Sequence, residues 1–435
     1  MITSNIGKIF LDAYNNKNGT DYDGKSFFIN VYHPLFFGAN KYLQWVQNSP
    51  FVQMKKGQKV ETLTLKEIDE KLKDFIAKVD GCMCPDASIA PGFPASEEKE
   101  FATTSGQVSN LSFSVNVDEI YLSWIGSSLG IGLSGGLSIL FSEPEILLDL
   151  FDGWKLYRKI ISEGNNVKGN QINTWNGQWL SHCYDNTNFY QEQPMADFNP
   201  FDDASKDGIG IKTQSWVKVL IGISKKFTNP QMMGYVYNFG QTNTTIGFIP
   251  FYLEHIRKPI QLYEKLFGSK EGGQAEELWG TEFGLRTCCQ MGRIGVEAMQ
   301  PKGMRQYIFP DKNGSVKFPK YNDSKLIEFH TYQIWLLAML NNDELWEKST
   351  TFAKVLYDFV SKDKKLSTKR SNLVDKIFES SSKRTFILAL NEIVSDAESL
   401  EQIEEHAKII HMMPADNVSY YLALIRFHFS LLKKK

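Results

Sequence analysis

The sequence predicts an α+β protein in two parts, a mixed body over residues 1–323 and an all-α helical bundle over residues 324–435. Two observations separate these parts. Before residue 324, helical stripes alternate with glycine-rich turns, polar loops and short apolar runs of period two. After it, the chain has no glycine and one proline, Pro414, while apolar stripes of helical period recur. Repeated stripes without breakers are typical of packed helices, so the second part is predicted to be a bundle.

The first elements of the body follow an aromatic-rich start. A helix is expected over Phe37–Gln47, just after a proline. Thr64 followed by Glu67 is a capping-box pattern, and it predicts an amphipathic helix over Leu65–Val79. Apolar residues then alternate with polar ones over Ser109–Val117, which indicates a half-buried strand.

An uncharged segment follows, from Ile120 to Ser142, and it is about as long as a membrane span. Its many glycines and serines lower its hydropathy and its helix propensity, so a membrane helix is not expected. Two strands joined by glycine turns are predicted instead, over Glu119–Ile125 and Gly136–Ser142. Residues 130–135 match GxGxxG, but the helix that a dinucleotide site requires does not follow, and a tight β turn is the better interpretation.

The rest of the body alternates helices with irregular chain. A helix is predicted from Pro144 to about Ser162, and residues 163–210 are expected to be irregular and polar. Further helices are expected over 212–227 and 250–267. In the bundle, helical stripes are predicted at 326–341, 344–361, 371–379, 383–397, 400–411 and 415–432.

Composition narrows the function classes. A net charge of −2 and a pI of about 6.4 argue against a protein that coats nucleic acid by charge alone. Five cysteines in a chain of 435 residues indicate a reducing compartment, and a cytoplasmic protein is expected. The first residues lack the pattern of a signal peptide.

Motifs of catalysis and metal binding are weak. The chain shows no HExxH, GxSxG or P-loop pattern, so we expect neither an enzyme nor a cofactor. Cys82 and Cys84 are spaced C-x-C, which does not meet the usual zinc spacing, and buried thiols are the simpler interpretation.

Two amide-rich blocks, Gly169–Trp179 and Asn238–Thr245, are the densest recognition signal. An amide presents a donor beside an acceptor and matches a base edge, whereas an indole offers a face for stacking. The candidates for reading a short DNA motif are Gln171, Asn173, Trp175, Asn176, Gln178, Gln241 and Asn243. Two alternatives stay open: the amides satisfy loop backbone while the indoles pack in the core, or they line a nucleotide or sugar pocket of an enzyme or binding protein.

Basic residues concentrate in one part of the bundle. The candidates for phosphate contact are Lys364, Lys365, Lys369, Arg370, Lys383 and Arg384. Acidic residues occur in the same stretch, so a solvated helix face is the alternative interpretation.

Both ends of the chain carry a family resemblance. Near the start, Tyr32-His33-Pro34-Leu35-Phe36-Phe37-Gly38 precedes Leu63-Thr64-Leu65 and its predicted helix. Near the end, Phe386–Val394 precedes Met412-Met413-Pro414-Ala415-Asp416 and Tyr420–Phe429. These segments are similar to the opening and closing helices of the large subunit of type I CRISPR interference (Cascade) complexes, most of all the short I-B subunits.

The resemblance implies a non-catalytic protein. The body would read a short motif beside the target and help open the duplex, and the bundle would line the path of the unwound DNA. Guide–target pairing would supply most of the sequence discrimination. The implied partners are a guide RNA complex with other CRISPR-associated subunits, double-stranded target DNA and a helicase-nuclease, without a membrane. Some relatives carry paired CxxC motifs, from which Cys82-Met83-Cys84 departs.

Overall fold

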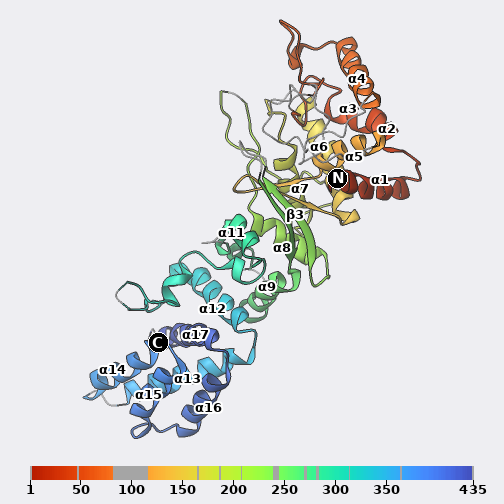
Figure 1. The fold of residues 1–435 in the computed structure, drawn as a ribbon. Helices are drawn as coiled ribbons and strands as arrows, with labels where there is room; N and C mark the ends of the chain where they lie inside the picture. The colour runs from red at the N-terminus through yellow and green to blue at the C-terminus, as the bar shows by residue number, and fades with distance from the viewer. Residues whose placement is uncertain are drawn as a thin grey trace. The chain divides into compact units, whose positions relative to one another are not determined.

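The structure is a computed structural model of the chain. It describes residues 2–46, 49–81, 116–163, 166–185, 188–206, 208–238, 244–268, 272–280, 284–312, 314–362 and 365–433. The chain divides into two compact units (Figure 1): unit 1 is Met1–Phe251 with Cys289–Gly292, and unit 2 is Tyr252–Cys288 with Arg293–Lys435. The 323/324 boundary expected from the sequence lies inside unit 2 of this division. The α+β class is as predicted, because unit 1 combines a small antiparallel sheet with helices and unit 2 ends in a helical region.

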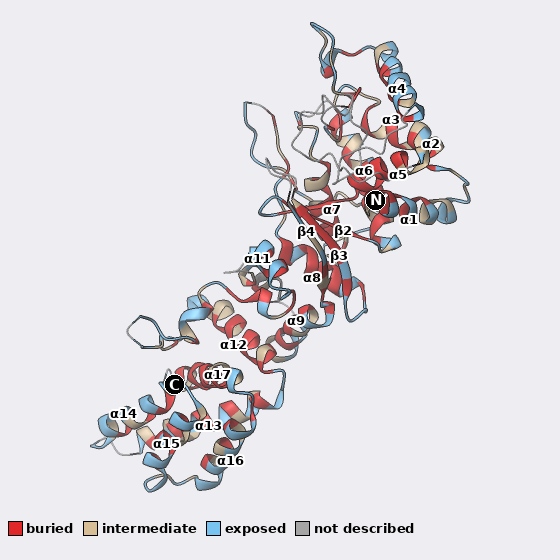
Figure 2. Cartoon of the chain, viewed as in Figure 1, coloured by how far each residue is buried: buried red, intermediate tan, exposed pale blue. Residues whose placement is uncertain are grey.

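The helices at the start of unit 1 carry many buried residues (Figure 2), and aromatic side chains are prominent among them. These elements are α1 (Ile2–Asn18), α2 (Gly24–Phe27), the π-helical turn η1 (Phe28–Tyr32), α3 (His33–Phe36), the 3-10 turn η2 (Val60–Thr62), α4 (Leu65–Asp80) and α5 (Val117–Ser128). Phe28 and Trp124 are fully buried, and their rings meet edge to face with centroids 5.9 Å apart. Such pairs are favoured by the ring quadrupoles, so the aromatic excess of this chain is used for packing.

Helices α1 and α5 cross at two glycines. A Cβ atom on Gly126 would lie 1.9 Å from the carbonyl oxygen of Thr3, and one on Gly7 would lie 2.0 Å from that of Leu122. The two backbones therefore approach more closely than any larger residue would permit. The sequence predicted that the glycines of this segment form turns. Gly126 instead lets two helices pack closely.

The strand expected over Glu119–Ile125 is wrong, because these residues belong to α5. Asn116 caps the helix, with its Oδ1 accepting the Glu119 N–H at 2.8 Å and its own N–H donating to the Glu119 carboxylate at 3.1 Å. Every residue from Ile120 to Ser128 is buried, so the sequence shows no one-sided stripe. Of the strand expected over Ser109–Val117, Val117 begins α5, and residues 109–115 lie outside the described part.

The helix expected over Phe37–Gln47 is also wrong, since residues 37–46 form a turn, bends and irregular chain. Helix α3 ends at Phe36, where the N–H groups of Phe37 and Gly38 both bond to the His33 carbonyl, at 2.8 and 2.9 Å. A Cβ on Gly38 would lie 2.8 Å from the Pro34 carbonyl oxygen, so only glycine lets the chain fold back here.

The capping box of α4 is confirmed. The Thr64 Oγ1 accepts the Glu67 N–H at 3.3 Å, and the Thr64 N–H donates to the Glu67 carboxylate at 2.8 Å. These bonds satisfy two of the backbone donors at the helix start and fix its position in the chain.

The sheet of unit 1 has four antiparallel strands in sequence order: β1 (Ile131–Leu133), β2 (Leu137–Phe141), β3 (Met232–Asn238) and β4 (Thr244–Phe251). Gly135 and Gly136 adopt φ of +87° and +71° in the β1–β2 turn, a conformation that glycine supplies without strain. The GxGxxG sequence therefore leads into a tight β turn, as interpreted from the sequence, but it also contains strand β1, which was not predicted; the strand predicted at Gly136–Ser142 is β2. The β3–β4 hairpin was not predicted.

Three helices complete unit 1: α6 (Pro144–Ser162), α7 (Ile172–Cys183) and α8 (Trp216–Lys226). Helix α6 has the predicted bounds. Helix α7 corrects the prediction that residues 163–210 are irregular throughout. Its buried residues mix polar and small side chains with apolar ones, so its sequence does not show the leucine-rich stripe of an ordinary amphipathic helix; they are Ile172, Trp175, Asn176, Gly177, Trp179, Leu180, Ser181 and His182.

Unit 2 contains the predicted bundle. Its helices are α9 (Leu253–Phe267), α10 (Gly272–Leu278), α11 (Gly284–Gln290, up to Cys288), α12 (Leu326–Leu340), α13 (Glu344–Ser361), α14 (Ser367–Phe378), α15 (Lys383–Val394), α16 (Leu400–Met412) and α17 (Val418–Leu432). Each of the stripes predicted after residue 324 corresponds to one of these helices. Helix α17 is the core of the bundle, because every residue from Tyr421 to Ser430 is buried.

Short 3-10 turns, η5 (Glu297–Met299), η6 (Met304–Tyr307), η7 (Asp323–Lys325) and η8 (Ala415–Asn417), join elements of unit 2. Within the described ranges, none of the helices combines the length and the hydropathy that crossing a bilayer requires.

Candidate functional site

The first amide block is a packed junction in unit 1. Trp175 is fully buried, its Nε1 donates to the Gly153 carbonyl at 2.9 Å, and its ring stacks on Tyr157 with centroids 4.9 Å apart. Asn176 is fully buried as well, and its Nδ2 donates to the carbonyls of Ser128 and Gly130 at 2.8 and 2.9 Å. Neither side chain can reach a ligand in this structure. Both residues were expected to read DNA, but in this structure they are core residues that pack and hydrogen-bond inside unit 1.

The other candidates of this block, Gln171, Asn173 and Gln178, are half-buried, and two of them bond to backbone. The Gln171 Oε1 accepts the Ile211 N–H at 3.1 Å, and the Gln178 Nε2 donates to the Lys212 carbonyl at 2.8 Å. These two bonds tie α7 to the chain segment that follows residue 210. Asn173 makes a 3.5 Å contact from its Nδ2 to the Ser138 hydroxyl. The alternative interpretation, amides that satisfy local backbone, describes Gln171 and Gln178.

The second block lies at the β3–β4 connection. Asn238 is the last residue of β3, and Thr244 is the first residue of β4. Gln241 and Asn243 lie outside the described residues.

The basic candidates of the bundle are not gathered in one place. Arg370 is buried, with its Nη1 donating to the Phe359 carbonyl at 3.1 Å and its guanidinium 4.9 Å from the Phe359 ring centroid. The Lys383 Nζ donates to the His411 carbonyl at 2.8 Å. Lys365, Lys369 and Arg384 are exposed, and Lys364 lies outside the described residues.

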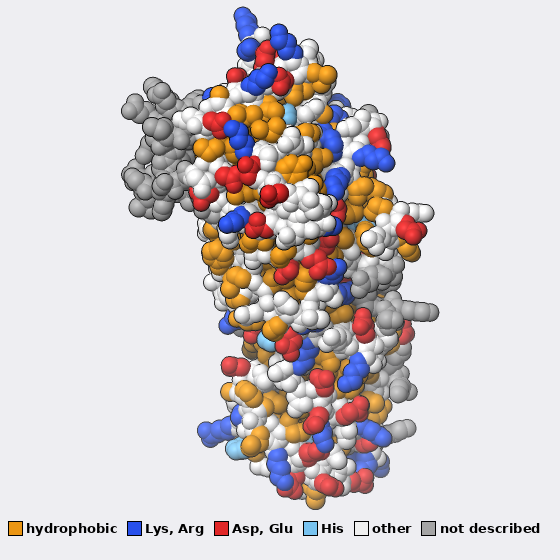
Figure 3. Space-filling view, turned by 90° about the vertical axis from the view of Figure 1, so that its right-hand side faces the viewer, with side chains coloured by type: hydrophobic (Ala, Val, Ile, Leu, Met, Phe, Trp, Pro, Cys, Tyr) orange, Lys and Arg blue, Asp and Glu red, His pale blue; other side chains and the backbone are white. Residues whose placement is uncertain are grey.

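Helices α14 and α15 are neighbours joined by a short connection, so their first turns lie at opposite ends of the pair. Lys369 and Arg384 are therefore separated by about the length of one helix, roughly 18 Å. Ion pairs occupy further lysines of the bundle, namely Lys348–Glu405, Lys362–Glu398, Lys376–Glu392 and Lys408–Glu404. At the lower end of Figure 3, basic and acidic side chains are interspersed. The solvated-face interpretation fits this part of unit 2.

Metal binding and thiol chemistry find little support among the described residues. That part of the chain contains no group of three or more His, Cys, Asp or Glu side chains placed to hold a metal ion. Burial raises the pKa of the Cys183 thiol to about 12 and that of Cys288 to about 11, so both stay protonated near neutral pH. Cys82 and Cys84 lie outside the described residues.

A basic segment that the sequence analysis passed over lies before the bundle, at residues 302–320. It contains five basic residues and a single acidic one, Asp311. The five are exposed, and within the described part of the chain none of them forms an ion pair: Lys302, Arg305, Lys312, Lys317 and Lys320. The net positive charge of these residues is visible in the sequence and could have identified the segment. Its prolines and glycines, however, predicted only turns there.

Buried groups of unit 2 hold this segment in place. The Arg426 Nη2 donates to the Tyr307 carbonyl at 3.0 Å, and the Tyr332 hydroxyl donates to the Lys302 carbonyl at 2.6 Å. Near the end of the segment, the Tyr321 N–H donates to the Ser430 hydroxyl at 3.1 Å. The basic side chains are therefore displayed by backbone that is fixed to the bundle core.

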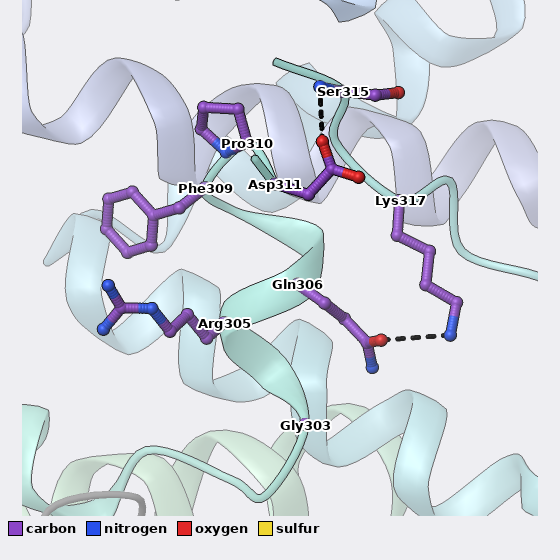
Figure 4. Close-up of a pocket in the computed structure, with 8 residues that line it drawn as sticks. All are labelled: Gly303, Arg305, Gln306, Phe309, Pro310, Asp311, Ser315 and Lys317. Carbon is purple, nitrogen blue, oxygen red and sulfur yellow. Dashed lines mark hydrogen bonds between the residues drawn. The ribbon is translucent and has the colours of Figure 1, made fainter. Parts of the chain in front are cut away.

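An open pocket of about 680 Å³ lies on this segment, and Figure 4 shows the side chains around it. The residues that line it are Gly303, Arg305, Gln306, Phe309, Pro310, Asp311, Ser315 and Lys317. The Arg305 guanidinium lies 5.5 Å from the centroid of the Phe309 ring. On the other side of the η6 turn, the Lys317 Nζ donates to the Gln306 Oε1 at 3.0 Å.

The carboxylate in this pocket is engaged locally. The Asp311 Oδ1 accepts the Ser315 N–H at 3.0 Å, and the Asp311 N–H donates to the Ser315 carbonyl at 2.9 Å. Asp311 is thus bonded twice to Ser315, whereas the side chains of Arg305 and Lys317 carry the positive charge of the pocket (Figure 4). The arrangement suits a ligand that carries phosphate.

Comparisons with family models, with curated proteins and with solved structures found no match for this chain.

Proposed function

We propose that this chain is a non-catalytic subunit that binds DNA within an RNA-guided complex, as the resemblance of its ends to type I CRISPR large subunits implies. The observation that carries the proposal is the anchored segment 302–320, with five exposed basic side chains and no ion pair among its described residues. Its partners would be the guide RNA with other CRISPR-associated subunits, the double-stranded target, and a helicase-nuclease that cuts.

Charge explains why a local segment matters in this protein. The chain as a whole carries a net charge of −2, so it has no general attraction for a polyanion. Basic groups that are already paired with carboxylates release few counterions when phosphate approaches, but unpaired ones contribute fully to the salt dependence of binding. The segment 302–320 therefore supports a short phosphate contact, with the other subunits holding most of the nucleic acid.

Motif reading would belong to a smaller set of amides than the sequence indicates. Trp175 and Asn176 are fully buried, so they are not included. We propose Gln241 and Asn243, on the β3–β4 connection, as the first residues to test. Replacing both by alanine should change the preference for the target-adjacent motif, and an unchanged preference would remove the second amide block from the proposal.

A small-molecule function is the second candidate, because the pocket on η6 has a volume within the range of ligand sites, about 300–1,000 Å³. The binding or turnover of a nucleotide or sugar would then be the activity. A thermal-shift screen separates the two functions. A rise of several degrees with a nucleotide or sugar, together with no binding of DNA, would favour this candidate.

The DNA-binding proposal is tested by salt titration. The variant Lys302→Gln/Lys312→Gln/Lys320→Gln removes three charges of the segment that do not line the pocket. The matched control Lys362→Gln/Lys376→Gln/Lys408→Gln removes three lysines that are in ion pairs. We expect the first variant to weaken duplex binding by the full chain and to reduce the slope of log K against log salt by about two to three. Equal slopes for wild type and both variants would contradict the proposal.

A further inference from the structure

The pocket on η6 combines cations with an exposed ring. The Phe309 side chain is 42% exposed, and the backbone of this residue is held by the segment around it. Its N–H donates to the Arg305 carbonyl at 3.0 Å, so the position of the ring is set by the η6 turn. Exposed aromatic rings beside unpaired cations are a feature of proteins that bind single-stranded nucleic acid, because every base has a face that can stack.

The polar side of the pocket can take the remaining parts of a nucleotide. The Lys317 Nζ has three donors, and one of them is used by the Gln306 Oε1. Arg305 places its guanidinium beside the Phe309 ring, where it can contact a phosphate oxygen while the opposite ring face stays open.

The shape of the pocket favours a strand over a free nucleotide. Arg305, Phe309 and Lys317 are all exposed, so the pocket is an open trough that a strand can enter and leave. A free mononucleotide would keep much of its surface in water there, whereas a strand gains additional phosphate contacts from the other lysines of the segment. A base pair inside a duplex has no free face to stack on Phe309.

From these observations we infer that the η6 pocket binds one unpaired nucleotide of a single strand, with its base on Phe309 and its phosphate at Arg305, and that Lys317, on the other side of the η6 turn, contacts a neighbouring phosphate of the same strand. The inference rests on the proposed function, because it uses the same basic segment. It goes further by assigning strand discrimination to Phe309, whereas the lysines outside the pocket contact single and double strands alike.

The test uses the full chain and fluorescence anisotropy with four probes: a labelled oligo-dT 15-mer, an oligo-rU 15-mer, a 15-base-pair duplex, and unlabelled dTMP as competitor. Phe309→Ala should weaken binding of the single strand roughly ten-fold, the loss expected for one stacked base, and should leave duplex binding within about two-fold. Phe309→Trp should restore single-strand binding. Phe248→Ala is the matched control, since Phe248 is also exposed, at 62%, but lies on β4 in unit 1.

The outcomes separate this inference from the proposed function. If Phe309→Ala leaves single-strand binding unchanged while the triple lysine variant still lowers the salt slope, the inference fails and the proposed function stands. If neither variant alters any binding, both fail. Equal losses with oligo-dT and oligo-rU support recognition of the base and phosphate that both strands share, and a loss with one of them assigns the pocket to that nucleic acid. Displacement of the oligo-dT by dTMP at micromolar concentration would instead identify a free nucleotide as the ligand and overturn the inference.

Discussion

The Nε1 of Trp154 on α6 donates a hydrogen bond to the Oδ1 of Asn176 on α7 over 3.0 Å, and both side chains are fully buried. The same amide donates to the carbonyls of Ser128 and Gly130, at the end of α5 and before β1. One side chain therefore joins three parts of unit 1. Buried polar groups that are fully hydrogen-bonded fix a single packing arrangement, because every alternative leaves one of them unpaired.

Asn176→Ala should destabilise unit 1 strongly. The substitution leaves one buried indole N–H and two carbonyls without their partner, and each such group costs about 1–3 kcal/mol. We expect the free energy of unfolding to fall by at least about 3 kcal/mol in urea titrations followed by tryptophan fluorescence. Gln178→Ala is the control, since that half-buried amide donates one bond, to the Lys212 carbonyl, and should cost about 1 kcal/mol. Similar losses for the two variants would contradict a junction role for Asn176.

The crossing of α1 and α5 should not tolerate a single added methyl group. In Gly126→Ala the new Cβ would lie 1.9 Å from the Thr3 carbonyl oxygen, so the helices must separate. We expect a loss of about 3 kcal/mol or failure to fold, measured by circular dichroism during thermal unfolding. Gly81→Ala, at the α4 C-cap with φ of −86°, is the control: its Cβ would lie 3.1 Å from the Ala77 carbonyl oxygen, so a far smaller loss than for Gly126→Ala is expected. A stable Gly126→Ala protein would show that the crossing can relax.

Arg370 and Lys369 are adjacent in the sequence but should behave differently. Arg370→Ala removes a buried hydrogen bond and the stacking on Phe359, so it should lower the stability of unit 2 by about 1–3 kcal/mol. The salt slope of DNA binding should be unchanged in that variant. Lys369→Ala should leave stability unchanged because the side chain is exposed. If Arg370→Ala had normal stability and a lower salt slope, the result would support the phosphate contact that the sequence predicted for Arg370.

The stability of unit 2 should fall in mild acid. Burial on α17 lowers the pKa of His428 to about 3, whereas an unfolded histidine has a pKa of about 6.5. Between these pH values the unfolded chain binds a proton that the folded chain does not, so this histidine's contribution lowers the free energy of unfolding as pH falls below 6.5. The contribution of His428 to the slope of the unfolding free energy against pH should approach about 1.4 kcal/mol per pH unit.

His428→Leu should flatten this dependence between pH 6 and 4, as measured by urea unfolding at several pH values. His411→Leu serves as the control, because it makes the same substitution at an exposed imidazole. If the His428 variant keeps the slope of the wild type, another group is responsible for the acid sensitivity.

Local signals in the sequence predicted much of this fold. The capping box at Thr64 and Glu67 fixes the start of α4 through two hydrogen bonds within one turn, so no distant residue is needed to foresee it. Bundle helices with one apolar face, such as α13 and α15, can likewise be read from the spacing of their own apolar residues. Helix α5 was misread because it is buried on all sides, and then neither period nor composition distinguishes a helix from strands.

The amide block and the basic segment show where such reasoning stops. Asn176 and Gln178 lie two residues apart in one block, yet one is fully buried and the other ties α7 to the Lys212 carbonyl. Residue type states what a side chain can bond to, but not whether its partner is a neighbouring backbone group or a ligand. At residues 302–320 the basic residues can be read from the sequence. That they form no ion pair within the described part of the chain is known only from the structure.

The sequence by itself determined the α+β class, the capped helix α4, the glycine turn between β1 and β2, and the helices of the bundle, because these depend on contacts between residues close in the chain. Only the tertiary structure decided that Trp175 and Asn176 are core residues, that Arg370 is buried, and that Arg305, Phe309 and Lys317 line one pocket. Each of these outcomes depends on which distant segment covers a side chain or leaves it open, and that is set by packing of the whole unit.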